Sequence, residues 1–261
     1  MKAFTRYNKE KIQEEGMIFF LITGATRGIG RAIVVELDGR YGENAAYLMI
    51  ARNEAGLDTL KGEIKGKAQV LAIDLSSPAR SGREVGEMLL KTDIAGYEKF
   101  VLINNAGVLS PVGKTGTLES NEIETNIQVN LTAPLILANE FLRWAGSSLK
   151  PKLIINISSG AARFPIVSWG AYCASKAGLD MFSRVMMEEK STGLQVISVA
   201  PGIIETDMQR SIRDLKPEQF PLVDRFVAYK SSGSLKTPEQ TAKEIVNIIE
   251  NPTDFDVIVS L

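Results

Sequence analysis

The chain has 261 residues, 44% of them hydrophobic, and its 30 basic and 31 acidic side chains leave a formal net charge of −1. This even balance argues against a nucleic-acid-binding surface. No apolar run reaches the ~18–20 residues of a membrane span, so we expect neither nucleic acid nor a membrane as a partner. With no histidine and a single cysteine, Cys173, the sequence excludes histidine-based catalytic triads and an intrachain disulfide, and it offers no pattern for a metal site.

Residues 1–16 mix lysine, arginine and glutamate side chains. A signal peptide needs an apolar centre and a transit peptide avoids acidic residues, so we expect a surface extension there. The remaining residues, 17–261, are predicted to form one domain. Because a lone cysteine fits a reducing compartment, we expect the protein to be cytoplasmic.

The first predicted strand is the continuous apolar run 17–23, which is typical of a strand buried on both faces. A glycine-rich turn follows, and residues 31–37 are predicted to be helical. This order favours dinucleotide binding, because glycines let the backbone approach a pyrophosphate at the helix N-terminus. A plain tight turn is the alternative. The residues of the predicted cofactor turn are Gly24, Ala25, Thr26, Arg27, Gly28, Ile29 and Gly30.

The second predicted strand, 46–51, ends at Arg52 and Asn53. An acid at this point binds the ribose 2′-hydroxyl of NAD, whereas an arginine suits the 2′-phosphate of NADP. Arg52, with Arg27 expected on the same side, therefore favours NADP(H). The alternative is that both are ordinary surface arginines. Glu54 could also compete with a 2′-phosphate for their side chains.

A helix over 54–65 and a strand over 68–73 lead to Asp74, whose carboxylate either accepts from the adenine amino group or caps the next helix. The strand predicted over 100–103 ends in small and amide residues, which allow close cofactor approach and bracing between strands but also form plain turns. The cofactor contacts predicted from these two strand ends are Asp74, Leu75, Asn105, Ala106 and Gly107.

One long helix is predicted over 119–146, interrupted at most by Pro134. Asn130 lies inside it, where asparagine lowers the helix propensity and needs a structural or functional reason. The strand over 152–157 then brings Ser158 and Ser159 to the sheet edge at which open α/β proteins bind ligands.

The next helix, ending near residue 190, carries Tyr172 and Lys176 four residues apart, so both side chains project from one face. An ammonium close to a phenol lowers the pKa of the phenol, so the pair predicts a proton donor and acceptor near neutral pH. A pair on a solvated helix face is the alternative, since this spacing also arises by chance.

The last part of the chain contains a strand over 194–199, a helix over 238–250 and a final strand near 255–259. Residues 203–236 do not follow this alternation of strands and helices. We predict that they form a partly helical lid near the sheet edge. Repeated strand–helix units predict a single-domain α/β fold, a Rossmann-type doubly wound parallel sheet of about seven strands flanked by helices.

Together these motifs resemble the short-chain dehydrogenase/reductase family over essentially everything after residue 16. The matching motifs are Thr23-Gly24-x-x-x-Gly28-x-Gly30, Asn104-Asn105-Ala106-Gly107, and Pro201-Gly202 with Thr206. The resemblance places the catalytic tetrad on Asn130, Ser159, Tyr172 and Lys176. Ser159 is preferred to Ser158 because it precedes Tyr172 by thirteen residues, the usual interval in the family.

The resemblance implies a carbonyl reduction in which Tyr172 protonates the developing alkoxide and Ser159 orients the carbonyl oxygen. Lys176 lowers the tyrosine pKa and binds the nicotinamide ribose, and Asn130 holds a water that links Lys176 to solvent. The cofactor contacts implied on the nicotinamide side are Tyr172, Lys176, Pro201, Gly202, Ile204, Thr206 and Met208.

A narrower likeness, carried by Ser168-Trp169-Gly170 and Ala200-Pro201-Gly202, is to the branch of sepiapterin and benzil reductases, which reduce α-dicarbonyls with NADPH. In the animal sepiapterin reductases an aspartate of the C-terminal tail anchors the pterin, and Ser260 aligns with it here. This argues against a pterin substrate, unless a different tail register places Asp256 at that position. The implied substrate contacts are Ser159, Gly160, Phe164, Trp169, Tyr172 and Gly202. The family also implies a homodimer formed through the helices near 119–146 and 170–190.

Two alternatives stay open from the sequence. The first is a short-chain reductase of another ketone, such as a steroid, a sugar or an acyl-carrier substrate. The second is a non-catalytic protein that senses NADP, which would not need to keep the predicted proton donor Tyr172.

Overall fold

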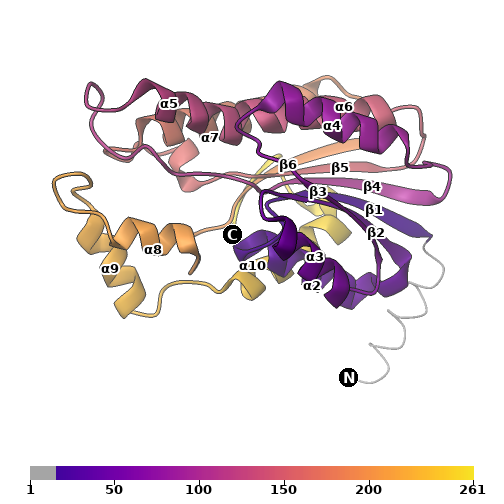
Figure 1. Ribbon diagram of the computed structural model, residues 1–261, viewed down its shortest axis with the longest axis horizontal. Helices are drawn as coiled ribbons and strands as arrows, with labels where there is room; N and C mark the ends of the chain where they lie inside the picture. The colour runs from indigo at the N-terminus through magenta and orange to yellow at the C-terminus, as the bar shows by residue number, and fades with distance from the viewer. Residues whose placement is uncertain (1–15) are drawn as a thin grey trace.

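A parallel sheet of seven strands forms the centre of the molecule in the computed structural model, which describes residues 16–261 (Figure 1). The predicted extension lies outside the described residues except for Gly16. The strands are β1 (Met17–Thr23), β2 (Ala45–Ala51), β3 (Lys67–Ala72), β4 (Tyr97–Asn104), β5 (Lys152–Ile157), β6 (Leu194–Ala200) and β7 (Ile258–Ser260). Their order is β3-β2-β1-β4-β5-β6-β7, and all pairs are parallel. The predicted doubly wound fold is thereby confirmed.

Strand β1 shows why the sheet lies in the core. Its side chains alternate between two apolar clusters, with Phe20 and Ile22 in one and Phe19 and Leu21 in the other. All four are at most 3% exposed. Burying each such side chain contributes about 1.5–3 kcal/mol, so an uninterrupted apolar sequence is stable only with helices over both faces.

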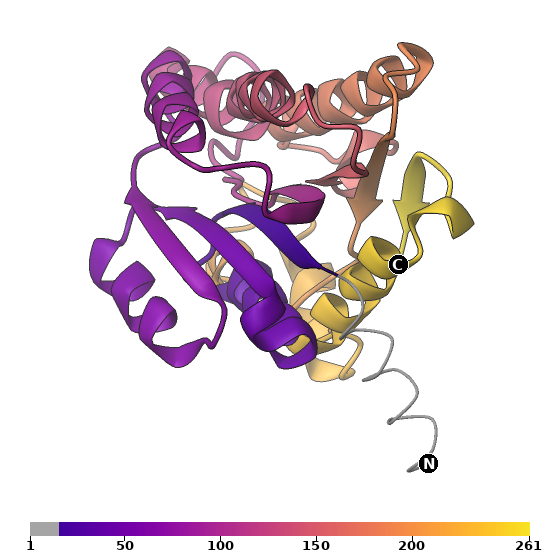
Figure 2. The ribbon, with the colours of Figure 1, turned by 90° about the vertical axis from the view of Figure 1, so that its right-hand side faces the viewer.

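Helices cover both faces of the sheet, and Figure 2 shows the two layers from the side. The first cluster contains buried residues of α2, α3 and α10, and the second contains those of α4, α6 and α7. The helices are α2 (Gly28–Tyr41), α3 (Glu54–Glu63), α4 (Pro78–Leu90), α5 (Ser120–Ile127), α6 (Ala133–Ala145), α7 (Gly170–Glu188), α8 (Asp207–Arg213), α9 (Val223–Ser231) and α10 (Pro238–Glu250). Short helical turns are η1 (Gly42–Asn44), η3 (Gly160–Ala162) and η4 (Pro252–Asp254).

The helix predicted over 119–146 is not one regular α-helix. A π-helical turn, η2 (Gln128–Thr132), separates α5 from α6 and contains Asn130. The side chains of Asn126 and Asn130 bond to the backbone of the segment after β4 instead of facing solvent. Such a bulge re-aims side chains, which is the structural reason for an asparagine at this position.

Two other element boundaries differ from prediction. Helix α2 begins at Gly28 inside the glycine turn, three residues before the predicted start. Strand β7 is Ile258–Ser260 instead of 255–259, because the short helical turn η4 and residues 255–257 precede it. Its pairing with β6 joins Val199 to Val259.

The segment 203–236 contains α8 and α9, which lie together at one end of the molecule beyond the sheet (Figure 1). A third apolar cluster joins them to Trp169 and Tyr172 through residues such as Ile212, Phe220 and Phe226. That this segment acts as a lid stays a prediction.

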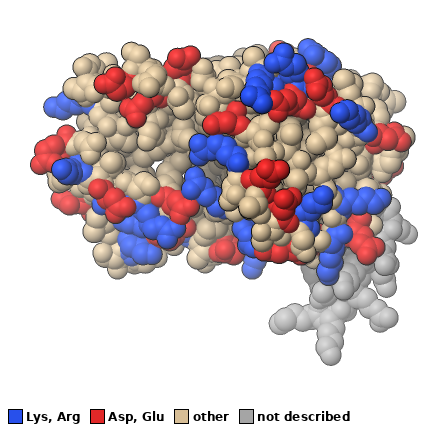
Figure 3. Space-filling view, viewed as in Figure 1, with Lys and Arg blue, Asp and Glu red and all other residues tan. Residues whose placement is uncertain are grey.

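Acidic and basic side chains are interspersed over the face seen in Figure 3, in keeping with the balanced charge of the chain. Within residues 16–261, no helix has the length and apolar character needed to span a membrane. The same part of the chain contains no cluster of three or more acidic or cysteine side chains that could hold a metal ion.

Candidate active site

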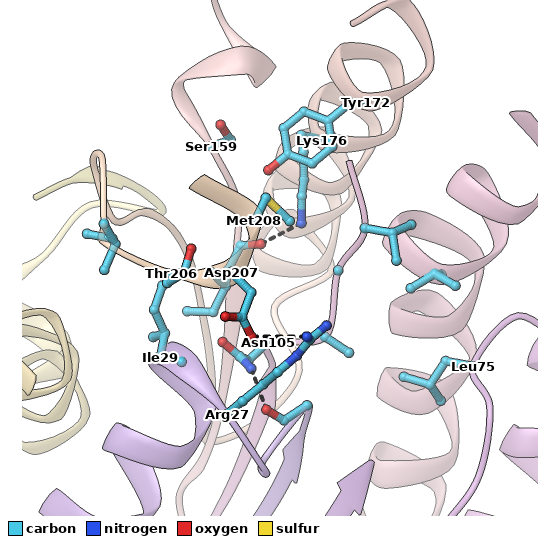
Figure 4. A pocket seen from close by; sticks show the side chains of 18 of the residues that line it. Arg27, Ile29, Leu75, Asn105, Ser159, Tyr172, Lys176, Thr206, Asp207 and Met208 are labelled. Carbon is cyan, nitrogen blue, oxygen red and sulfur yellow. Dashed lines mark hydrogen bonds and ion pairs between the residues drawn. The ribbon is translucent and has the colours of Figure 1, made fainter. Parts of the chain in front are cut away.

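A cavity of about 350 Å³ opens at the carboxyl ends of the central strands, where the strand order reverses between β1 and β4 (Figure 4). It is within the usual size range of small-molecule sites. Its walls come from the glycine turn, the ends of β2 to β6, α7 and the start of α8. This is the position at which open α/β sheets bind their ligands.

The glycine turn is shaped by positions that accept no side chain. Gly24 and Gly28 have φ values of 67° and 53°, in the left-handed region that favours glycine. At Gly30 a Cβ would overlap the carbonyl oxygen of Gly24 and lie 2.5 Å from Asn105 Nδ2. The turn can therefore bring bare backbone and the start of α2 close to a pyrophosphate.

Hydrogen bonds between Thr23 and Asn105 hold the turn against β4. Asn105 Nδ2 donates to the carbonyl oxygens of Thr23 and Gly24 at 2.9 and 3.2 Å. The Thr23 hydroxyl accepts the backbone N–H groups of Asn105 and Ala106 at 2.9 and 3.0 Å. Below them, Asn104 donates to Asn156 of β5, which confirms the predicted bracing between strands.

The two arginines predicted to bind a 2′-phosphate, Arg27 and Arg52, both line the cavity. Arg27 Nη1 donates to Asp207 Oδ2 at 3.1 Å, so it joins the glycine turn to α8 (Figure 4). The hydrogen bond from Arg210, with the positive charge of Arg27, lowers the pKa of Asp207. Arg52 is exposed and has no ion-pair partner among the described residues.

Asp74 and Leu75 line the cavity as predicted. Asp74 does not cap α4, because Ser77 occupies the N-cap position. Instead its carboxylate accepts the N–H of Ser76 at 2.9 Å and closes a short turn. Asn53 is the N-cap of α3, where it accepts the N–H of Gly56, and it does not line the cavity.

Asn130 is fully buried beside Lys176. Its Oδ1 accepts the N–H of Val108 at 2.9 Å, and its Nδ2 donates to the Val108 carbonyl at 2.7 Å. A Cβ at Gly107 would lie 3.1 Å from Asn130 Oδ1 and 3.6 Å from Lys176 Nζ, so the three residues are neighbours. The π-turn thus places Asn130 next to the predicted catalytic lysine, while its water-holding role stays a prediction.

Tyr172, Ser159 and Lys176 line the same cavity, so the structure brings these three members of the predicted tetrad together (Figure 4). Helix α7 begins two residues before Tyr172, and Ser159 follows β5 as the N-cap of η3. Lys176 Nζ lies 5.7 Å from the centre of the Tyr172 ring and donates to the Ile157 carbonyl at 2.8 Å.

The expected lowering of the tyrosine pKa is not present. Burial raises the pKa of Tyr172 to about 12, and the hydrogen bond with Ser159 offsets only part of this. Burial also lowers the pKa of Lys176 to about 8, against the charge of Asp180. Desolvation dominates because both side chains are less than 8% exposed and the ammonium bonds to a carbonyl rather than to the phenol.

Several predicted contacts do not line the cavity. Phe164 is 70% exposed and lies outside it, so the structure does not place it as a substrate contact. The other predicted site residues that do not line it are Ala25, Thr26, Gly30, Asn53, Asn130 and Gly160.

Sequence reasoning missed the face of α8 that lines the cavity. Asp207, Gln209 and Ile212 contribute to the wall beside the predicted Met208. Reading Thr206 as an N-cap would have predicted a helix here, since its hydroxyl accepts the N–H of Gln209.

Comparison with known proteins gives consistent results. The family described as short chain dehydrogenase matches residues 19–217. The chain is 34% identical to a benzil reductase ((S)-benzoin forming) from Bacillus cereus, covering 90% of this chain and 94% of that protein. It is 32% identical to a sepiapterin reductase from Meriones unguiculatus, covering 91% and 93% respectively. A solved short chain dehydrogenase/reductase from Saccharomyces cerevisiae has a TM-score of 0.80 and 25% identity, covering 94% of this chain and 96% of that one.

Proposed function

This chain belongs to the short-chain dehydrogenase/reductase family of oxidoreductases, and from that premise we propose that it is an NADPH-dependent carbonyl reductase acting on α-dicarbonyls or related ketones. The observation that carries the proposal is that Tyr172, Ser159 and Lys176 share one cavity with the glycine turn. The similarity to benzil and sepiapterin reductases supports the substrate class.

The cavity suits a dinucleotide. The glycine turn offers backbone that a Cβ would block, and Arg52 and Arg27 stand at the end of β2 and in the turn, where a 2′-phosphate needs positive charge. Asp74, Leu75, Ala106 and Ile204 supply further walls. When bound, the nicotinamide supplies the hydride for the carbonyl carbon.

The residues of the chain supply the proton and hold the carbonyl. Tyr172, with a pKa of about 12, is protonated at neutral pH and donates from Oη to the developing alkoxide. The Ser159 hydroxyl donates to the same oxygen and stabilises its charge. Lys176, with a pKa of about 8, is mostly protonated at pH 7 and places a buried positive charge beside the phenol. That charge favours the phenolate that is left after the proton transfer.

The tail of the chain supports a dicarbonyl over a pterin. Ser260 replaces the acid expected for pterin binding, and its hydroxyl accepts from Arg163 Nη1 at 2.8 Å. Arg163 also lies 3.6 Å from the buried carboxylate of Asp180. A hydroxyl already bonded to an arginine is a poor anchor for the N–H donors of a pterin ring.

The experiment that tests the function is NADPH oxidation by the wild-type protein and Tyr172→Phe with benzil, diacetyl, sepiapterin and a simple ketone. We expect wild-type turnover with the dicarbonyls and a loss of at least about 100-fold in kcat for Tyr172→Phe, because the variant keeps the ring but not the proton. NADPH binding, followed by fluorescence, should change little. Turnover of the simple ketone alone would contradict the substrate class, and near-normal turnover by the variant would contradict the mechanism.

We also propose a cytoplasmic homodimer. Ile123 on α5 and Met181 and Val185 on α7 are 38%, 60% and 47% exposed, so both helices present large apolar side chains to solvent. A second copy of the chain would cover them. Sedimentation at the mass of a monomer for the wild-type protein would contradict this.

A further inference from the structure

Asn126 is a buried polar side chain that the proposed mechanism leaves without a role. It lies in α5, one turn before Asn130, and is 0% exposed. Its Nδ2 donates to the carbonyl oxygens of Ser110 at 2.7 Å, Leu109 at 3.0 Å and Val108 at 3.3 Å. A single amide thus holds three consecutive carbonyls of the segment that follows β4.

The acceptor end of the same amide joins two elements of the site. Asn126 Oδ1 accepts from Asn130 Nδ2 at 3.0 Å and from the Ser175 hydroxyl at 3.1 Å. Ser175 lies on α7 directly before Lys176, and its hydroxyl is also 3.0 Å from the carbonyl oxygen of Tyr172. Asn126 therefore links the π-turn η2, which contains Asn130, to the helix that carries the proposed proton donor and its lysine.

These bonds leave the Asn130 amide little freedom. Its Nδ2 donates to the carbonyl of Val108 at 2.7 Å and to Oδ1 of Asn126 at 3.0 Å. Its Oδ1 accepts the N–H of Val108 at 2.9 Å, and a Cβ at Gly107 would lie close to both this oxygen and Lys176 Nζ. An amide oxygen can accept two hydrogen bonds, so Asn130 keeps accepting capacity near the ammonium.

Only a side chain with both donors and an acceptor can make the two sets of bonds at position 126. Residues 108–110 present carbonyl oxygens, whereas Asn130 and Ser175 present N–H and O–H groups. A carboxylate would repel the carbonyls, and an apolar side chain would leave buried groups on both sides unpaired, which is costly. The chemistry of the partners thus explains why an asparagine stands here.

We propose that Asn126 is a positioning residue that acts on the reaction through Asn130. This rests on the proposed function. Asn126 fixes the Asn130 amide directly, and it also fixes Val108, whose backbone holds the other end of that amide. Without Asn126, the Asn130 amide loses its fixed place near Lys176. The proton transfer that relies on the lysine then slows, whereas the glycine turn and the cofactor side of the cavity stay in place.

The test is a double-mutant cycle of Asn126→Leu and Asn130→Ala, with NADPH-dependent turnover of benzil as the readout. We expect Asn126→Leu to lower kcat about 30-fold and to change KM less than about threefold, because it affects proton transfer rather than binding. In the Asn130→Ala background the same change should lower kcat by less than about threefold, since the residue through which it acts is gone. An equal fold loss in both backgrounds, or a normal kcat in either single variant, would overturn the proposal.

Asp38→Ala is the matched control for lost stability. Asp38 is also buried, and its carboxylate also fastens a loop, by accepting the backbone N–H groups of Lys65 and Gly66, but it does not line the cavity. The melting temperature should fall by about 5–10 °C in both variants, whereas Asp38→Ala should keep kcat within about twofold. If Asp38→Ala lowers kcat as much as Asn126→Leu does, the loss reflects instability and the proposal fails.

A second variant and a structural readout cover the remaining outcomes. If Asn126→Leu does not fold, Asn126→Ser takes its place in the cycle, because it removes the amide and leaves room for a water. If the wild-type protein reduces no dicarbonyl, the proposed function fails, and a crystal structure of the position 126 variant still tests the placement. The Asn130 amide should then have left the backbone of Val108, and unchanged bonds between these two residues would contradict the positioning role.

Discussion

The two sides of the cavity are built differently. On the cofactor side, the polar groups of Thr23, Gly24 and Asn105 bond to one another across β1 and β4. On the substrate side, buried atoms of Ser158, Trp169 and Gln209 have no partner within the described part of the chain. The turn is therefore fixed by its own hydrogen bonds, although Asn104 Oδ1 below it has no partner among the described residues, whereas the polar atoms of the substrate side are less completely bonded.

The difference follows from what each side has to recognise. A dinucleotide is met mainly by backbone, so the turn must have its final shape before binding, and internal hydrogen bonds fix that shape. A substrate is met by side chains, which must keep some hydrogen-bonding capacity for it. We therefore expect the cofactor side to tolerate the least change and the substrate side to show changes in specificity.

Gly30→Ala, a change on the cofactor side, is expected to have the largest effect on stability and on NADPH binding. The added methyl group would overlap the Gly24 carbonyl oxygen and displace Asn105, both parts of the rigid turn. We expect a loss of about 3 kcal/mol in the free energy of unfolding and at least a tenfold weaker binding of NADPH, measured by urea denaturation and fluorescence titration.

Gly39→Ala is the control on the same helix, because a Cβ at Gly39 meets nothing within 4 Å. It should raise the free energy of unfolding by about 0.5–1 kcal/mol, as alanine does in an exposed helix interior. If the two variants had similar free energies of unfolding and similar affinities for NADPH, the turn would not be preformed.

The second prediction concerns Lys176, which lies where the two sides meet. Its pKa of about 8 in the folded chain is below the usual 10.5, so between these values the unfolded chain binds more protons than the folded one. The stability of the wild-type protein relative to Lys176→Met should therefore rise with pH, by about 3 kcal/mol from pH 8 to 10.5, and this contribution is lost again as the pH falls through 8.

Urea denaturation of both proteins at pH 7, 8, 9 and 10 measures the difference. Lys243→Met, at an exposed lysine of α10, is the matched control. A difference between wild type and Lys176→Met that stays constant over this range would contradict a buried, desolvated ammonium.

The smallest effect is expected at the rim of the cofactor side, where the structure distinguishes two arginines. Arg52 is free of ion pairs among the described residues, whereas Arg27 already bonds to Asp207. Arg52→Ala should raise the Kd of NADPH about tenfold and that of NADH by less than about threefold, since only NADPH carries the extra phosphate. Arg27→Ala should give a smaller loss, because Asp207 competes for its charge. An equal effect of Arg52→Ala on both cofactors, measured by fluorescence titration, would contradict the 2′-phosphate site.

Much of the fold could be predicted because local and long-range requirements agree. The apolar run 17–23 must be buried on both faces, and only a strand covered by two helical layers does this. Likewise Thr237 and Gln240 form a capping box that starts α10 where the pattern predicts it. The positions of Ser159, Tyr172 and Lys176 on one cavity follow from the strand order.

What could not be predicted depends on contacts between distant segments. The π-turn at Asn130 exists because the side chain bonds to Val108, 22 residues earlier. The high pKa of Tyr172 depends on burial under α9 and the loop before it, which a motif does not record. Phe164 was predicted as a substrate contact because it is aromatic, but its side chain is largely exposed and lies outside the cavity.

The central place of β1 has a consequence for biosynthesis. Strand β1, the first strand of the described residues, pairs on one side with β2 and on the other with β4, where Leu21 aligns with Leu102. The hydrogen bonds that complete the glycine turn come from Asn105, 82 residues after Thr23. The nascent chain therefore exposes an apolar strand until β4 has been synthesised, and a chaperone that binds such a segment would hold it for that interval.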